Sequence, residues 1–487
     1  MSAAIGRQHQ SQEAAAKAVL LPHDLRTESL SEPLGVDQPH PRLSWKLSVA
    51  DGERAVNQVA YRVMVGSTRS AVEGNEPDIW DSGIVKSADQ LEVLYDGSAL
   101  VSRQRCYWVV QVWHDLEASP SKSETTWWEA GLLNPEDWKA SWIGDGKPLP
   151  DSDAELYEDH PAPVFRKEFR VSKPVKRARI YGTGLGYASF RINGNRISNS
   201  VLDPAWTNTE KTVFYSCDDV TKLLNQGENV VVAALGNGWH NPLPMRMWGR
   251  INIREHLPVG APKLICQLHV EYVDGTQEVI ISDDTWQVAE GPLLRNSVYL
   301  GEKYDARKEI DGWDKPGEPE ADWSAATEVT GPAGRMIASP LPPIRITKSL
   351  KPVSVNEVEP GVFVFDMGQN FAGWVQLNVS GPRGTTVKMR MGELVYEDGT
   401  LNPMTAVAGQ IKGNKPDGES VGGPGCPEIA WQENTYTLRG DGLETYRPSF
   451  TFHGFRYVEV TGFPGTPTVD SIIGHRLNTD VERAGEF

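Results

Sequence analysis

A chain of 487 residues is long enough for three or four domains, each with a core of its own. Its 65 acidic and 48 basic residues give a net charge of −17, which argues against nucleic acid and against an anionic membrane surface as partners. The four cysteines, Cys106, Cys217, Cys266 and Cys426, lie far apart without CxxC spacing, and this pattern fits reduced thiols better than a disulfide framework.

The beginning of the chain, Met1 to Lys17, is polar and rich in alanine and glutamine. It contains no basic region followed by an apolar run, so we expect no signal peptide. No stretch of the sequence approaches 18 consecutive apolar residues, so we expect no transmembrane segment. These features predict a cytoplasmic protein with a disordered tail over residues 1–21.

Strand signals dominate the rest of the chain, and helical periodicity is rare. The strand-like runs are short, rich in β-branched and aromatic residues, and bounded by turn residues. The clearest are Gln58–Val65, Tyr107–Val112, Ala188–Ile192, Val230–Leu235, Leu264–Tyr272 and Val375–Val379. Asn193-Gly194 and Asp274-Gly275 predict tight hairpin turns, and a single helical turn is expected near Asp219–Leu224, capped by Asp218 or Asp219.

These runs predict an all-β fold of tandem β-sandwiches. Residues 22–140 carry about seven strand-like runs at the spacing of a sandwich. Residues 141–340 form a longer all-β unit, and residues 341–474 a third sandwich with a mobile insertion at Lys412–Gly425. Residues 475–487 are expected to be a linker.

Long motifs resemble those of one enzyme family. They are Pro22–Leu47, Trp127–Gly144, Gly182–Ile197, Leu202–Tyr215, Leu235–Asn241, Tyr299–Asp314, Phe365–Val379 and Pro448–Gly462. In content and order they resemble the N-terminal β-domains of bacterial α-L-rhamnosidases. The resemblance implies a fibronectin-III-like domain, a jelly roll and a concanavalin-like domain.

The resemblance also implies the activity of the family, the hydrolysis of terminal α-L-rhamnose from glycosides with inversion. The family's general acid and base belong to a fourth domain, an (α/α)6 barrel with a Cys-Pro-Gln-Arg-Asp-Glu-like run, and this sequence has no such run. We therefore expect a truncated form, inactive alone, that self-associates through uncovered surfaces. The alternative is a stand-alone carbohydrate-binding or scaffold protein, which the DNA after Phe487 would distinguish.

Two loops of the jelly roll are the candidate site for a rhamnose-containing glycoside. Some relatives use this domain as a calcium-dependent rhamnose-binding module, although the family needs no cofactor for hydrolysis. The resemblance places oxygen ligands at Asp203, Asn208, Asn237 and Asn241, with Asp203 and Asn208 as the calcium ligands, and stacking or hydroxyl-binding groups at Trp206, Trp239 and His240. In the alternative interpretation, the two tryptophans are core residues and the asparagines hold turns.

Other candidate residues have structural interpretations. Asp283-Asp284, Asp218-Asp219 and Glu302 with Asp305 are carboxylate pairs that we interpret as turn and cap residues. His453 is predicted to be a hydrogen-bonded structural residue, and Gly368–Trp374 to be a turn. The glycines at 182, 184 and 186 predict close strand packing and not a dinucleotide loop. The sequence contains no Ser-His-Asp order, HExxH, P-loop or zinc-ligand spacing.

Overall fold

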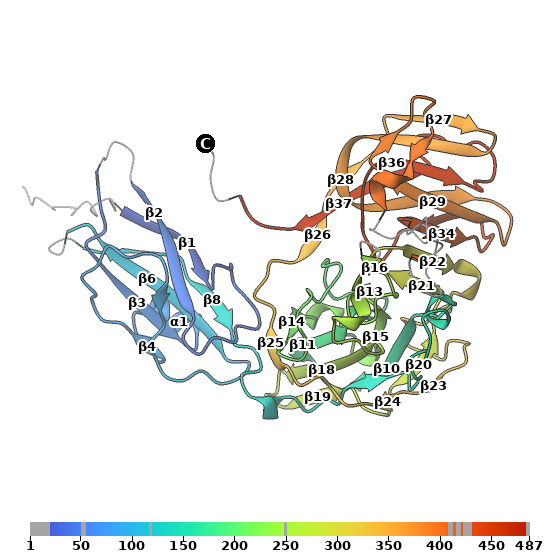
Figure 1. Cartoon of the computed structure of the whole chain (residues 1–487). Helices are drawn as coiled ribbons and strands as arrows, with labels where there is room; N and C mark the ends of the chain where they lie inside the picture. Colours follow the sequence, from blue (N-terminus) through green and yellow to red (C-terminus); the bar gives the residue numbers. More distant parts are fainter. Residues whose placement is uncertain are drawn as a thin grey trace, which may run out of the picture. The chain divides into compact units, whose positions relative to one another are not determined.

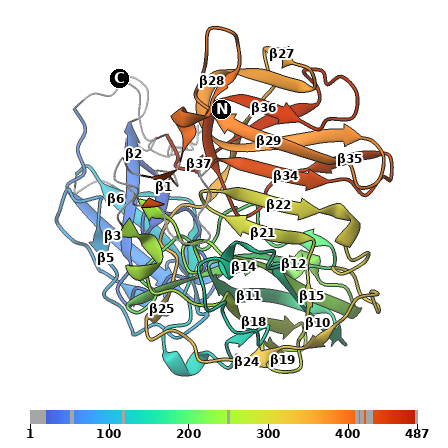
Figure 2. The ribbon, with the colours of Figure 1, turned by 45° about the vertical axis from the view of Figure 1, so that its right-hand side comes forward.

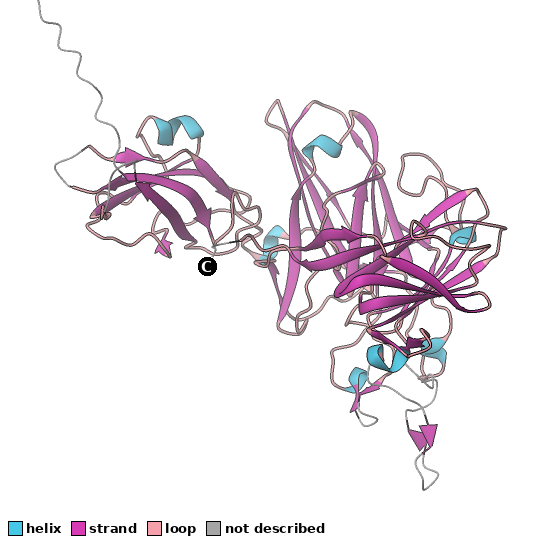
Figure 3. Cartoon of the chain, turned by 90° about the horizontal axis from the view of Figure 1, so that it is seen from above, coloured by secondary structure: helices cyan, strands magenta, loops and turns pink. Residues whose placement is uncertain are grey.

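The computed structural model describes residues 20–49, 55–115, 119–247, 251–407, 413–414, 420–421 and 431–483. The chain divides into two compact units, residues 1–134 and residues 135–487. Strands make up nearly all of the regular structure in both units (Figure 3). This confirms the predicted all-β fold.

The first unit is a sandwich of two antiparallel sheets. Its strands are β1 (Leu20–Thr27), β2 (Arg42–Val49), β3 (Ala60–Gly66), β4 (Trp80–Asp81), β5 (Val93–Leu94), β6 (Arg105–Trp113), β7 (Ser121–Lys122) and β8 (Thr126–Glu129). The sheet β1-β2-β5 faces the sheet formed by β4, β3, β6, β7 and β8. Trp45, Trp108 and Trp128 are fully buried between them. Since β1 begins at Leu20, the predicted tail boundary at residue 21 is wrong by two residues; residues 1–19 lie outside the described chain.

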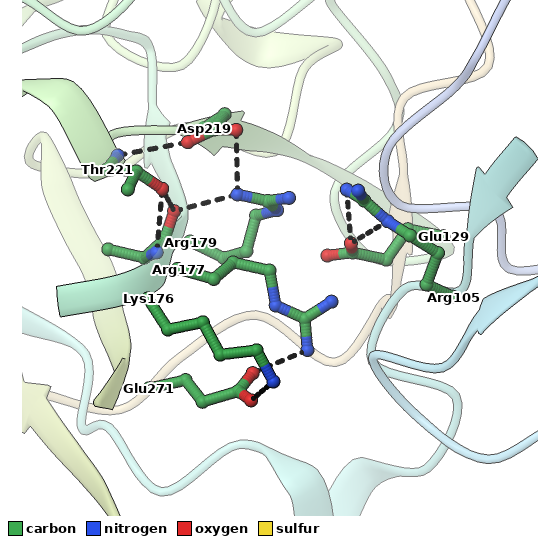
Figure 4. Close-up of polar contacts among 9 residues, drawn as sticks. Arg105, Glu129, Lys176, Arg177, Arg179, Asp219, Thr221 and Glu271 are labelled. Atoms are coloured by element: carbon green, nitrogen blue, oxygen red, sulfur yellow. Dashed lines mark hydrogen bonds and ion pairs between the residues drawn. The ribbon is translucent and has the colours of Figure 1, made fainter. Parts of the chain in front are cut away.

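Two features of the first unit were not predicted from the sequence. The helix α1 (Arg69–Glu73) is the one α-helix among the described residues, and its Thr68 cap accepts a hydrogen bond from the N–H of Ala71. The side chain of Glu129 is fully buried and forms an ion pair of 2.9 Å with Arg105 (Figure 4). The guanidinium of Arg105 also lies 3.9 Å from the ring centroid of Trp127, so its charge is stabilised on two sides.

The second unit begins with another two-sheet sandwich, at the position of the predicted jelly roll (Figure 1). One sheet contains β10 (Pro163–Val171), β12 (Tyr187–Ile192), β13 (Asn195–Arg196), β15 (Gly227–Gly236), β20 (Gln287–Glu290) and β23 (Ser324–Ala325). The other contains β9 (Ile143–Gly144), β11 (Val175–Leu185), β14 (Thr212–Asp219), β18 (Lys263–Tyr272), β19 (Gln277–Ile281), β24 (Thr327–Glu328) and β25 (Arg335–Ala338). The aliphatic core between them includes Ile180, Val231 and Leu268.

Turn chemistry in the jelly roll follows the local sequence. Asn193 and Gly194 both have positive φ, 50° and 84°, and join β12 to β13 in the predicted two-residue hairpin. At Asp274-Gly275 only Gly275 has positive φ, and the turn closes through its N–H to Tyr272. The predicted helical turn is the 3-10 turn η3 (Thr221–Leu223), and the carboxylate of Asp219 accepts the N–H of Thr221 (Figure 4).

The third lobe is built on a ten-stranded sheet. Its strands are β21 (Leu293–Ser297), β22 (Gly301–Asp305), β26 (Ile344–Leu350), β27 (Ser354–Glu359), β28 (Val362–Ser380), β29 (Thr386–Gly392), β34 (Glu433–Thr437), β35 (Leu443–Tyr446), β36 (His453–Thr461) and β37 (Ile472–Thr479). Figure 2 shows β36, β29, β34, β22 and β21 side by side. In β29 the buried residues alternate, with Val387, Met389 and Met391 turned into the core.

This sheet corrects two predicted domain boundaries. β21 and β22 lie in the segment assigned to the jelly roll, yet β22 pairs in parallel with β34. β37 continues to Thr479, so the expected linker at residue 475 begins inside a strand that pairs with β26. The predicted insertion 412–425 lies mostly outside the described residues, apart from the paired β32 (Gly413–Asn414) and β33 (Ser420–Val421).

The predicted turn at Gly368–Trp374 is a bulge within β28. The register against β36 jumps from Asp366 to Phe371, so four residues bulge out opposite Arg456, and Gly368 takes a φ of 77°. Arg456 donates two hydrogen bonds of 2.9 Å to the carboxylate of Asp366 at the edge of this bulge. The strand therefore passes through the segment without ending, and a bidentate ion pair holds the irregularity.

Short elements complete the described chain. The small strands are β16 (Arg246–Met247) with β17 (Ile251–Asn252), and β30 (Leu394–Val395) with β31 (Leu401–Asn402); the 3-10 turns are η1 (Pro135–Asp137), η2 (Glu155–Tyr157), η4 (Ile253–Glu255), η5 (Ala306–Lys308) and η6 (Pro403–Ala406). Within the described ranges no helix has the length and apolar character that a membrane crossing requires.

A buried carboxylate lies inside the third lobe, on the strand β22 that the sequence had assigned to the jelly roll. Glu302 is only 3% exposed and accepts hydrogen bonds from the N–H groups of Ser449 (2.9 Å) and Phe450 and from the Tyr446 hydroxyl (3.2 Å). We had interpreted Glu302 as a turn residue, and that interpretation is wrong because the residue lies inside the shared sheet. Its partner Asp305 does cap η5 by accepting the N–H of Arg307.

The pH dependence of stability should reveal this carboxylate. Burial raises the pKa of Glu302 to about 7, against the hydrogen bonds from Phe450, Ser449 and Tyr446, which lower it. The folded state therefore binds this proton more tightly than the unfolded state, whose ordinary pKa is 4.5. The contribution of Glu302 to stability is largest below pH 4.5 and falls as the pH rises towards 7, by at most about 3 kcal/mol at about 1.4 kcal/mol per pH unit.

We expect Glu302→Gln to make this decline shallower, because glutamine does not ionise, while Asp203 and Asp218, whose pKa values are also raised, keep their own share. Urea unfolding of both proteins at pH 5 and pH 8, followed by tryptophan fluorescence, measures the difference. Glu124→Gln, which removes the same charge from an exposed position, should keep the wild-type decline. Equal slopes for wild type and Glu302→Gln would mean that Glu302 does not titrate in this range.

Candidate functional site

The two predicted loops converge at one end of the jelly roll. One loop leads from β13 to β14 and carries Trp206, and the other follows β15 and carries Trp239. The two indole centroids lie 6.0 Å apart with the rings tilted by 46°. Trp239 also packs edge-on against Tyr299, at 5.3 Å between centroids. We call these two loops, residues 203–208 and 236–241, the tryptophan loops.

Between the tryptophan loops lies a small hollow. Its walls include Gly186, Tyr187, Trp206, Trp239 and His240, and its volume is about 20 Å³. That is room for about one water molecule, and a sugar ring cannot be enclosed there. Trp206, however, is 56% exposed, which is unusual for so large an apolar side chain. A sugar would therefore lie on the open face of Trp206, with the hollow receiving at most one substituent.

His240 adds a neutral polar group to this hollow. Desolvation, followed by the charges of Lys263 and Arg254, lowers its pKa to about 4, while the nearby backbone of Pro258 opposes the shift. Neither ring nitrogen has a hydrogen-bond partner among the described residues, and the ring lies close to Gly260. Both ring nitrogens are buried, with the Pro258 backbone and Gly260 against the ring, so a sugar hydroxyl would reach the imidazole only if this loop moved.

The predicted asparagines are already engaged by the protein. Asn237 donates to the carbonyl of Asn296 (2.9 Å) and accepts from Asn241 (3.0 Å), and Asn241 accepts from Arg254 (2.8 Å). The side-chain oxygen of Asn208 accepts the N–H of Glu210 within its own turn. These amides hold the tryptophan loops in place, which agrees with the alternative interpretation for the asparagines. They would have to exchange partners to bind a ligand directly.

Asp203 lies beside Asp218, a neighbour that sequence reasoning did not identify. Desolvation raises the pKa of Asp203 to about 6 and that of Asp218 to about 7, where the charge of Asp203 adds to the effect. Asp218 is paired in register with Ile180, so both point to the same face of the sheet, and the Ile180 side chain lies in the core. The buried residues of β14, Val213 and Tyr215, alternate on the other face of the strand, so the hydrophobic pattern gave no signal for this orientation.

The predicted calcium ligands do not form a full coordination shell. Among the described residues no group of three or more histidine, cysteine, aspartate or glutamate side chains could hold a metal ion. Asp203 and Asn208 offer one carboxylate and one amide, whereas calcium takes six to eight oxygens. Asp219, adjacent to Asp218, is occupied by an ion pair of 2.9 Å with Arg179 (Figure 4).

A larger hollow of about 550 Å³ lies elsewhere in the jelly roll. It is lined by Lys147 and Glu290, which form an ion pair of 2.6 Å, and by Lys308, Glu309 and Asp322 among others. None of its described lining residues is aromatic, so it offers no stacking face for a sugar ring. On this chemistry the tryptophan loops remain the better carbohydrate site.

Family models match three consecutive parts of the chain. A Rha78A-like N-terminal immunoglobulin domain matches residues 22–134, an α-L-rhamnosidase N-terminal domain residues 173–348, and a bacterial α-L-rhamnosidase concanavalin-like domain residues 356–478. The first is described as an immunoglobulin domain where we expected a fibronectin-III-like one; both are antiparallel sandwiches.

Relatives and solved structures carry the same description. An α-L-rhamnosidase of Streptomyces avermitilis is 31% identical over 94% of this chain and 57% of its own length, and one of Formosa agariphila is 31% identical over 94% and 48%. The solved α-L-rhamnosidase from Dictyoglumus thermophilum superposes with a TM-score of 0.81 at 38% identity, over 95% of this chain and 49% of that one. The Streptomyces avermitilis enzyme, solved with L-rhamnose, gives a TM-score of 0.81 at 29% identity, over 95% and 57%. The chain spans about half the length of these proteins.

The position of the second tryptophan loop depends on a close contact at Gly236. A Cβ at this residue would overlap the ring of Phe450, which lies parallel to Tyr187 with centroids 6.3 Å apart. We expect Gly236→Ala to lower the free energy of unfolding by about 1–3 kcal/mol through overpacking, measurable by urea unfolding. Gly454→Ala is the control, since the nearest atom to its new methyl group is a carboxylate oxygen of Glu393 at 3.9 Å. An equal loss in both variants would contradict the contact.

Proposed function

We propose that this chain, which belongs to the bacterial α-L-rhamnosidase family, supplies the β-domains of an enzyme that hydrolyses terminal α-L-rhamnose from glycosides. The observation that carries the proposal is the match of three family domains, in order, over residues 22–478. The relatives named above share this activity in their description and exceed the chain in length. The activity of the whole enzyme is therefore part of the proposal.

We place the hydrolytic carboxylates outside the described residues. An inverting glycosidase needs one protonated and one ionised carboxyl group, about 6.5–9.5 Å apart, on either side of an accessible sugar. The described carboxyl groups with strongly raised pKa values are Asp203, Asp218 and Glu302. Glu302 is sealed inside the shared sheet, and Asp218 shares its face with the sandwich core. Neither arrangement leaves room for a sugar between two carboxyl groups.

The purified 487-residue chain is accordingly expected not to hydrolyse an aryl α-L-rhamnoside above background. Release of the aryl group, followed by absorbance between pH 4 and pH 8, measures this. Turnover of about 1 s⁻¹, an ordinary enzymatic rate, would contradict the assignment. The double variant Asp203→Asn/Asp218→Asn would then test whether this pair is responsible.

For the tryptophan loops we propose weak binding of L-rhamnose. The supporting observations are the exposed face of Trp206 and the half-buried Trp239 that lies beside it. In this proposal the three amides Asn208, Asn237 and Asn241 position the loops. Calcium remains an optional part of the proposal, with Asp203 as its carboxylate ligand.

Titration calorimetry with L-rhamnose, in calcium and then in chelator, tests this site. We expect a millimolar dissociation constant, as is usual for a small ligand with few contacts. Trp206→Ala should weaken binding at least tenfold, because it removes the stacking face. Tyr396→Ala, which removes a comparably exposed aromatic ring of the third lobe, is the matched control and should bind normally.

Two outcomes would count against this site. Binding that survives Trp206→Ala would place the site elsewhere, and no binding in either buffer would return both tryptophans to a packing role. A loss of binding in chelator that Asp203→Asn reproduces would support the calcium ligand, whereas equal binding in both buffers would remove calcium from the proposal.

A cytoplasmic location and self-association also belong to the proposal. Among the described residues, Cys106 and Cys266 are free thiols, which agrees with a reducing compartment. Leu394, Tyr396 and Met404 are all about half exposed on the small β30–β31 hairpin and η6, which offers an apolar surface for weak association. No observation favours the stand-alone scaffold over the proposed enzyme.

A further inference from the structure

The outer face of the third lobe carries a polar patch next to the jelly roll. Trp374 on β28 lies directly opposite His475 on β37, so both side chains point to the same face. On that face Trp374 packs with Val201 and Leu202 of the jelly roll. His475 contacts the hydroxyl of Ser349 (2.9 Å) and the side-chain oxygen of Gln376 (3.1 Å). The apolar contact between the lobes thus continues into a hydrogen-bonding surface.

Arg447 lies on this patch without a counter-ion. Its guanidinium carbon is 5.1 Å from the ring centroid of Trp374. Within the described ranges it forms no ion pair or hydrogen bond, although it is half-buried. Desolvation lowers its pKa, and its charge in turn lowers the pKa of His475, for which desolvation is the larger cause. A partly desolvated cation held only by a ring face lacks the hydrogen bonds that its five N–H groups can make.

A second arginine lies on the jelly-roll segment that leads to Val201 and Leu202, which share an apolar cluster with Trp374. Arg196 follows the Asn193-Gly194 turn and donates to the carbonyls of Ser198 (3.4 Å) and Ser200 (2.8 Å). The next residue, Val201, pairs with Ile344 at the start of β26, which brings this segment onto the third lobe. Arg196 is exposed at the surface; desolvation of part of its side chain and then the charges of Arg447 and Arg191 lower its pKa. No described carboxylate raises the pKa of Arg196 in return. Asp314, the acidic residue at this end of the jelly roll, forms an ion pair of 2.7 Å with Arg191.

We propose that Arg447 and Arg196 form a binding site for an oxyanion, such as the carboxylate or sulfate group of an acidic glycan. The guanidinium fork matches the geometry of either group, and one anion between two unpaired cations would remove their mutual repulsion. His475 borders the site as a hydrogen-bonded neutral ring. The glycan part rests on the proposed function, whereas the oxyanion site rests on the two arginines alone.

Calorimetric titration at low ionic strength with sodium D-glucuronate, with sodium sulfate and with D-glucose tests the site. We expect millimolar binding of one or both anions and none of glucose, which has the sugar ring without the charge. The double variant Arg447→Gln/Arg196→Gln should weaken anion binding at least tenfold, and Arg447→Lys should retain part of it by keeping the charge. Arg170→Gln, at an exposed arginine paired with Glu228, is the control and should bind normally.

A second readout uses the wild-type chain, so that it does not depend on whether the variants fold. An anion beside Arg447 offsets the charge that lowers the pKa of His475, so saturating sulfate or glucuronate should raise that pKa. The ring signals in an NMR titration report it, with His475→Gln used for assignment.

The site would be overturned by undiminished anion binding in the double variant, by glucose binding as well as glucuronate, or by no binding up to about 50 mM of either anion, well above the expected millimolar range. An unchanged pKa of His475 at saturating anion would also overturn it. The rhamnose titration reports on the proposed function separately, because L-rhamnose carries no charge.

Discussion

The larger unit depends on one carboxylate placed where water cannot reach it. The side chain of Glu302 projects from β22 and accepts hydrogen bonds from the backbone N–H groups of Ser449 and Phe450, which lie outside the strands. An unpaired buried carboxylate would be strongly unfavourable, so the turn at residues 446–450 must stay where it is. The backbone carbonyl of the next residue, Thr451, accepts a hydrogen bond from the indole N–H of Trp374. One acidic side chain of the third lobe thereby fixes the turn from which Phe450 reaches the jelly roll at Gly236 and Tyr187.

Both candidate binding surfaces are arranged around this junction. Phe450 extends from the Glu302 turn onto Gly236 and Tyr187, at the base of the tryptophan loops. Trp374 belongs to the same apolar cluster, and the guanidinium of Arg447 lies over its ring. The cluster between the lobes is therefore the common support of a neutral, aromatic surface and a cationic one. A glycan with both apolar ring faces and acidic groups would find complementary chemistry on one unit of the chain.

The parts of the fold that could be predicted from sequence are those decided locally. The β-branched and aromatic runs predicted the strands β3, β6, β12, β15 and β18. Asn193-Gly194 predicted the hairpin between β12 and β13, because few residue pairs tolerate two consecutive positive φ values. Trp206 and Trp239 were correctly expected to meet. Helix α1 was missed because five residues are too few for a 3.6-residue period to show. The burial of Glu302 and the proximity of Asp203 to Asp218 depend on pairings across long sequence separations, which leave no local pattern.

The parallel pairing of β22 with β34 has a practical consequence for anyone who divides this chain. Matches at residues 173–348 and 356–478 suggest two separable modules. A recombinant fragment that begins after residue 340 would lack β21 and β22. Thr435 of β34, which pairs with Lys303 in the whole chain, would then lie on an open sheet edge. Such an edge is a template for strand addition from another molecule. A fragment that contains the third lobe should therefore begin before Leu293, so that β21 and β22 stay with the sheet they complete.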